Sequence, residues 1–274
     1  MKDLGWSEAQ HYVMDARYAD GDSGVATRIA AELVATRPDV VLTTAETSIL
    51  ALASFTKNIP IVFANAADPV GNGYAASLQR PGGNMTGLTL LTPELAAKRV
   101  ELLKELAPQT ARTLVLFEPA DPASLSQVKA MEAAAARLNI RLTPREIRQP
   151  ADIDAAFESA RTAAVDSCLI VSGPLINIQR KAIAARILGL KVPSITSNVI
   201  HTEAGVLMSY SASVPANFRR AAVFVDKILK GARPGELAIE QPTKIDLVIN
   251  AKTAKALGVA IPESLRVRAD RVIE

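Results

Sequence analysis

Small polar and acidic residues directly follow apolar runs in both halves of this chain. They are Thr44, Glu46, Thr47, Ala67 and Asp68 in the first half, and Glu118, Asp121, Ser172, Gly173, Ser197 and Asn198 in the second. Hydroxyl groups and free backbone N–H groups at a helix start can bind a carboxylate, and a carboxylate can hold an ammonium group. The pattern therefore indicates binding of a small charged solute.

Each of these residues has a second interpretation, because the same residue types cap helices. Taken singly, each is more often a helix cap than a ligand contact. Their joint position at successive strand ends favours a common site, since ligands of parallel sheets bind outside the carboxyl ends of the strands.

Motifs for cofactor, metal or catalytic chemistry are weak in this sequence. Gly71–Ala76 matches the G-x-G-x-x-A pattern only weakly, because Asp68–Val70 separates it from the preceding strand, whereas in a dinucleotide fold the motif directly follows the strand. His11 and His201 have no nucleophile beside them, and we expect His201 to lie solvated in a polar loop. The single Cys168 is expected in the core. We therefore expect no cofactor, no metal and no enzymatic activity.

The composition is typical of a globular α/β protein with one large or two ordinary domains. Of the 274 residues, 49% are hydrophobic and 4% aromatic. The net charge is +3, but basic residues alternate with acidic ones, so we expect no nucleic-acid partner. No apolar run reaches the roughly 18 residues that a membrane span needs.

Apolar runs that alternate with helical patterns predict parallel sheets covered on both faces, in two Rossmann-like lobes. Residues 11–19 are predicted as a strand, 71–78 as a short helix, 175–188 as one helix, and Thr92 as a helix cap. Met1–Trp6 lacks the apolar region of a signal peptide and is interpreted as a helix end stopped by Gly5. We therefore expect the first strand and helix of the N-terminal lobe to be missing.

Several segments carry a family resemblance that covers essentially the whole chain. They are Pro60–Val70, Ala76–Gly87, Gly205–Tyr210, Glu240–Gly258, Ile261–Leu265 and Ala269–Ile273. They resemble the ABC transporter substrate-binding proteins of the type that includes binders of tryptophan and other aromatic amino acids. One departure is Phe117-Glu118-Pro119, where the family often has Tyr-Asn-Pro.

The resemblance implies a type I periplasmic-binding fold, with two lobes that close on a small solute. We expect residues 1–88 plus 206–238 to form the N-terminal lobe, and residues 89–205 plus 239–274 the C-terminal lobe. The resemblance also implies a monomeric periplasmic receptor that works with an ABC permease in the membrane.

The solute expected is an amino acid or a related carboxylate. Its carboxylate would meet Thr44 and Thr47, and its ammonium group would pair with Asp68. Ser172, Ser197 and Tyr210 would complete the site. Two alternatives stay open: the effector-binding domain of a transcription regulator, which should carry a helix-turn-helix, and a Rossmann-type enzyme, which needs a positioned acid, base or nucleophile.

Overall fold

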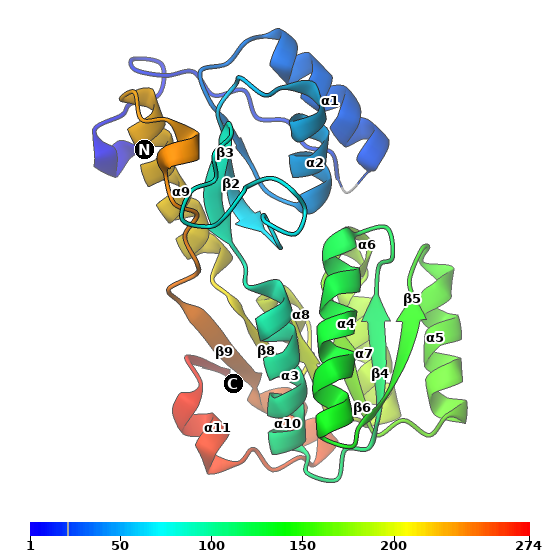
Figure 1. Cartoon of the computed structure of the whole chain (residues 1–274). Coiled ribbons are helices and arrows are strands. Elements are labelled where there is room, and N and C mark those ends of the chain that lie inside the picture. The colour runs from blue at the N-terminus through cyan, green and yellow to red at the C-terminus, as the bar shows by residue number, and fades with distance from the viewer. Residues whose placement is uncertain (21) are drawn as a thin grey trace. The chain divides into compact units, whose positions relative to one another are not determined.

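The computed structural model describes residues 1–20 and 22–274, and it divides into two compact units (Figure 1). Unit 1 comprises Met1–Leu91 and Ala212–Lys244, and unit 2 comprises Thr92–Ser211 and Ile245–Glu274. The divisions therefore fall after residues 91, 211 and 244, whereas the sequence boundaries were expected after residues 88, 205 and 238.

Unit 1 holds a three-stranded parallel sheet with the order β1-β2-β3. Its elements are η1 (Lys2–Leu4), α1 (Ser23–Ala35), β1 (Val41–Thr43), α2 (Glu46–Phe55), β2 (Ile61–Ala66), β3 (Met85–Thr89), α9 (Val214–Leu229) and η2 (Pro234–Glu236). Phe63 of β2 packs with residues of α1 and α2, whereas Val62 packs with Phe224 of α9. Every residue of β2 is buried because helices cover both faces of the sheet.

Unit 2 holds a seven-stranded sheet with the order β10-β9-β8-β7-β6-β4-β5. Its strands are β4 (Arg112–Phe117), β5 (Arg141–Glu146), β6 (Ser167–Ile170), β7 (Ser194–Thr196), β8 (Met208–Ala212), β9 (Ile245–Asn250) and β10 (Arg271–Ile273). Strand β4 pairs in parallel with β5 and β6, and β7 pairs in parallel with β6 and β8. The α/β class and the parallel sheets predicted from the sequence are confirmed.

Helices cover both faces of the unit 2 sheet as well. They are α3 (Thr92–Leu106), α4 (Pro122–Arg137), α5 (Ala151–Thr162), α6 (Pro174–Ile178), α7 (Arg180–Leu190), α8 (Val199–Glu203), α10 (Ala251–Leu257) and α11 (Glu263–Arg268). Figure 1 shows α3 and α4 side by side on one face, and their apolar residues pack with Val115. Leu114 points to the other face and packs with residues of α5 and α7. Cys168 is buried in that second cluster, as predicted.

Two elements predicted in the first half of the chain are wrong. Residues 11–19 form no strand: Tyr12 makes an isolated bridge with Glu8, and the side chain of Val13 is 89% exposed. Apolar alternation alone does not make a strand without a neighbouring strand to receive its backbone hydrogen bonds. Residues 71–78 form successive turns rather than a helix, since Gly73 adopts a left-handed φ of 74°.

The other differences concern helix ends. Thr92 is the first residue of α3 rather than its cap, and its hydroxyl oxygen is buried without a partner in the structure. The predicted helix 175–188 is divided at Gln179 into α6 and α7. Gly5 does stop a helical turn, with a φ of 84° after the short helix η1.

Candidate functional site

The carboxyl ends of β1 and β2 in unit 1 carry a chain of polar side chains. The amide nitrogen Nδ2 of Asn65 donates to the hydroxyl oxygen of Thr44 at 3.2 Å, and Nδ2 of Asn217 in α9 donates to Oδ1 of Asn65 at 2.9 Å. Asn65 and Asn217 are buried, whereas Thr44 is exposed. Because its oxygen accepts from Asn65, the Thr44 hydroxyl can present its proton to an anion.

The start of α2 adjoins Thr44. Ala45 has a φ of 67° and turns the chain from β1 into the helix, a conformation that costs about 1–3 kcal/mol for a non-glycine residue. The carbonyl of Ala45 accepts the N–H groups of Ser48 and Ile49. Thr47 is half-buried and stands just before Ser48, so its N–H group belongs to the first turn of α2. The helix start therefore offers a donor next to Thr44.

Glu46 and Ala67, both predicted as site residues, contact each other. The carboxylate of Glu46 is 5% exposed, and it accepts the N–H of Ala67 at 3.1 Å and Nδ2 of Asn72 at 2.5 Å. These bonds tie the first residue of α2 to the loop after β2. In this structure the carboxylate therefore holds the loop in place.

Asp68 caps a turn in the loop after β2. Its Oδ1 atom accepts the N–H of Gly71 at 2.8 Å, and a Cβ atom on Gly71 would lie 2.1 Å from Oδ2 of Asp68. The half-buried carboxylate thus makes the contact that the capping interpretation predicts. The second oxygen remains the candidate for an ammonium group.

Glu118 and Gly173 lie against each other in unit 2. Oε1 of Glu118 accepts the N–H of Ile176 at 2.7 Å, and a Cβ atom on Gly173 would lie 2.5 Å from that oxygen. Glu118 therefore caps the start of α6. Burial raises the pKa of Glu118, and the nearby charge of Asp121 also raises it. The backbone N–H donors lower this pKa and offset part of the rise. Asp121 itself accepts the N–H of Ala123 at 3.0 Å and caps α4.

Ser172, Ser197 and Asn198 form one network at the carboxyl ends of β6 and β7. The N–H of Ser172 donates to Oγ of Ser197 at 2.7 Å, and Nδ2 of Asn198 donates to Oγ of Ser172 at 3.4 Å. Asn177, which the sequence reasoning missed, receives the Ser172 hydroxyl proton at 2.7 Å and also contacts His201. His201 is fully buried, so the expectation that it lies solvated is wrong.

Tyr210 and Arg99 meet at the middle of β8. Tyr210 is half-buried, and its carbonyl oxygen accepts Nε of Arg99 at 2.8 Å. Arg99 is 3% exposed and also donates through Nη1 to Oε1 of Gln127 at 3.0 Å. Burial lowers the pKa of Arg99 to about 9. Nothing in the local sequence indicates this role, because Arg99 stands in a run of alternating charges typical of a solvated helix face.

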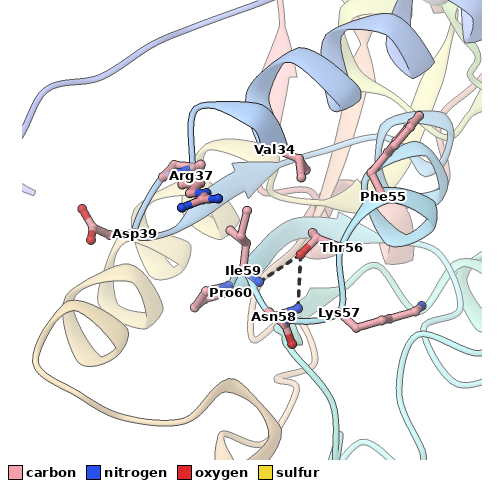
Figure 2. A pocket seen from close by; sticks show the side chains of 10 residues that line it. Val34, Arg37, Asp39, Phe55, Thr56, Lys57, Asn58, Ile59 and Pro60 are labelled. Carbon is pink, nitrogen blue, oxygen red and sulfur yellow. Dashed lines mark hydrogen bonds between the residues drawn. The ribbon is translucent and has the colours of Figure 1, made fainter.

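A surface pocket in unit 1 lies away from all of these residues (Figure 2). Its volume is about 590 Å³, and Pro38 and Asp39 before β1 and Ile59 and Pro60 before β2 are among the residues that line it. It is therefore at the amino ends of the strands, opposite the edge where parallel sheets bind ligands. Thr56 shapes this pocket by accepting two backbone N–H groups at 3.1 and 3.0 Å, drawn as dashed lines in Figure 2.

Neither a metal site nor a membrane helix is found within residues 1–20 and 22–274. No cluster of three or more His, Cys, Asp and Glu side chains there could hold a metal ion. None of the helices in that part of the chain is long and apolar enough to cross a membrane.

Two α/β units, each with a parallel sheet, define the type I periplasmic-binding fold, and solved structures agree. A conserved domain protein from Vibrio cholerae O1 biovar El Tor matches with a TM-score of 0.92 and 30% identity, over 99% of this chain and 90% of that one. The ABC domain in complex with L-Trp from Streptococcus pneumonia matches with a TM-score of 0.91 and 27% identity, over 99% and 91%.

The chain belongs to the ABC transporter substrate-binding protein family, whose model matches residues 1–273. A tyrosine-binding protein from Clostridioides difficile (strain R20291) is 24% identical over 94% of this chain and 74% of its own length. The resemblance and the fold expected from the sequence are therefore confirmed, and the chain is a solute-binding protein of this family. Which residues contact the solute stays a prediction.

Proposed function

We propose that this receptor binds an aromatic amino acid for an ABC importer, as a monomer in the periplasm that delivers its solute to a membrane permease and catalyses no reaction. The observation that carries the proposal is the match along the chain to a protein with bound L-Trp, together with the relative named for tyrosine. The family match supports the pairing with a permease.

The polar edge of unit 1 supplies groups suited to the carboxylate of such a solute. The buried amide of Asn65 fixes the Thr44 oxygen as an acceptor, which turns the hydroxyl proton toward a ligand. The N–H groups at the start of α2, at Glu46 and Thr47, add donors where the helix dipole favours negative charge.

The remaining candidates divide into contacts and supports. Asp68 is the candidate partner of the ammonium group, and Ser172, Ser197 and Tyr210 are the candidate contacts from unit 2. Ala67, Asp121, Gly173 and Asn198 shape the loops that carry them, together with the carboxylates of Glu46 and Glu118.

Titration calorimetry with L-tryptophan, L-tyrosine and L-leucine tests the proposal. We expect the two aromatic amino acids to bind more tightly than leucine. Thr44→Val should weaken binding about 10-fold or more, because a charge-assisted hydrogen bond is lost. Thr27→Val is the matched control in unit 1, since the exposed Thr27 hydroxyl bonds the carbonyl of Ser23 in its own helix. No heat of binding with any of the three would contradict the proposed solute class.

A further inference from the structure

His201 holds both ring nitrogen atoms against polar side chains in the interior of unit 2. Nε2 lies 2.7 Å from Oδ1 of Asn177, and Nδ1 lies 3.2 Å from the hydroxyl oxygen of Thr196. Burial, with a smaller contribution from the charge of Arg180, lowers the pKa of His201 to about 4. The ring is therefore neutral near pH 7 and carries a single N–H group.

Asn177 decides which nitrogen carries that hydrogen. Its Oδ1 atom can only accept, so Nε2 of His201 is the donor and Nδ1 accepts the hydroxyl proton of Thr196. The oxygen of Thr196 accepts the N–H of Asn198 at 3.4 Å, which leaves the Thr196 proton for His201. The directions of all these hydrogen bonds agree with one another.

The same oxygen of Asn177 fixes the direction of the Ser172 hydroxyl. Ser172 Oγ lies 2.7 Å from Oδ1 of Asn177 and donates its only proton there. Nδ2 of Asn198 donates to Ser172 Oγ at 3.4 Å and occupies one lone pair. What the Ser172 hydroxyl has left to offer a ligand is its second lone pair, which accepts a hydrogen bond and cannot donate one.

We propose that Asn177 and His201 are positioning residues that hold Ser172 as a hydrogen-bond acceptor, so that unit 2 selects a solute with an ammonium group over the same solute without it. This inference rests on the proposed function, since it concerns how the same solute is recognised. An acceptor repels a carboxylate oxygen, whereas an ammonium group has three N–H donors and can satisfy more than one acceptor.

The histidine tautomer can be measured without any ligand. The chain has two histidines, and His11→Gln leaves His201 alone, so nitrogen spectra of ¹⁵N-labelled His11→Gln protein report on a single ring. We expect hydrogen on Nε2. Hydrogen on Nδ1 would overturn the inference, because the Asn177 amide would then have to donate to His201 and to Ser172, which would release the Ser172 proton.

The selection itself is measured with matched pairs of solutes. One pair is L-tryptophan and indole-3-propionate, which lacks the amino group, and the other is L-tyrosine and 3-(4-hydroxyphenyl)propionate. We expect the wild type to prefer the amino acid, and Ser172→Ala to reduce that preference about 10- to 100-fold, the range for one hydrogen bond to a charged group. Ser264→Ala is the control, because the exposed Ser264 hydroxyl bonds Glu105 on the surface.

Two variants of Asn177 separate positioning from general structural support. Asn177→Asp keeps an acceptor toward both Ser172 and His201 and should retain the preference for the amino acid. Asn177→Leu removes that acceptor and should reduce the preference even where circular dichroism shows an intact fold. Equal preference in both variants would overturn the inference.

The two hypotheses fail in different ways. If neither amino acid binds the wild type while Nε2 carries the hydrogen, the proposed function is contradicted and the selection falls with it. If the amino acids bind and Ser172→Ala leaves the preference for them unchanged, this inference alone is wrong.

Discussion

Arg99 in α3 donates through Nε to the backbone carbonyl of Tyr210, 2.8 Å away and 111 positions further along the chain. This bond holds the middle of β8, two residues before the chain passes at Ala212 from unit 2 to unit 1. The guanidinium is buried, and it donates to two neutral oxygens, those of the Tyr210 carbonyl and the Gln127 side chain. Such a group is costly to bury and must be held by good geometry.

Arg99→Met should therefore lower the free energy of unfolding by about 1–3 kcal/mol, because the Tyr210 carbonyl and the Gln127 amide lose their donor. Urea unfolding measures the effect. Lys98→Met is the control, since Lys98 beside it forms an ion pair with the exposed Glu101 on the surface. Equal stability of wild type and Arg99→Met would mean that the bond to β8 contributes nothing.

Asp68→Ala should weaken binding of L-tryptophan or L-tyrosine by about 2–5 kcal/mol, because the buried ammonium group of the ligand is left unpaired. The free energy of unfolding should fall by only about 1 kcal/mol, the contribution of a cap. The matched control is Asp22→Ala. Asp22 accepts the N–H of Val25 at 2.9 Å, just as Asp68 accepts that of Gly71 at 2.8 Å, but it caps α1. If calorimetry shows the same affinity for both variants and wild type, Asp68 is a turn cap only.

Gly173→Ala should destabilise unit 2, because the new Cβ atom would lie 2.5 Å from the Glu118 carboxylate. A cost of about 1–3 kcal/mol is expected for such overpacking. Glu118→Ala in the same chain should remove most of that added cost, which a double-mutant cycle measures. Gly189→Ala in α7 is the control and should stabilise the helix slightly, since nothing lies near its Cβ position. Additive effects at 118 and 173 would contradict the contact.

Stability should fall as the pH falls from about 6.5 to about 4. The pKa of His201 is lowered to about 4 in the folded chain, so between these values the unfolded chain binds the proton more readily. The stabilisation that His201 contributes is fully present above the pKa of this histidine in the unfolded chain. It is lost progressively as the pH falls below that value, and the total loss is on the order of 3 kcal/mol. The free energy of unfolding, measured with urea at several pH values in this range, should change less with pH for His201→Gln than for wild type. His11→Gln, which changes an exposed ring, should keep the wild-type dependence of the unfolding free energy on pH.

The sequence by itself determined most of the strands, their parallel arrangement and the family. A short apolar run such as Ile61–Ala64, between Pro60 and the polar Asn65, is typical of a strand buried on both faces, and this needs no knowledge of distant residues. The polar residues that follow such runs lie at the strand ends for the same reason.

Tertiary structure alone decided which polar groups are buried and which way their hydrogen bonds run. Asn65 meets Asn217, 152 positions away, and His201 meets Asn177 across 24. Residues 11–19 have a strand-like pattern, but they pair with no strand in the part of the chain that the structure describes. Arg99 stands among charges that resemble a solvated face. A local pattern records the period of a helix or a strand, whereas the burial of a single polar group depends on the segments that fold over it.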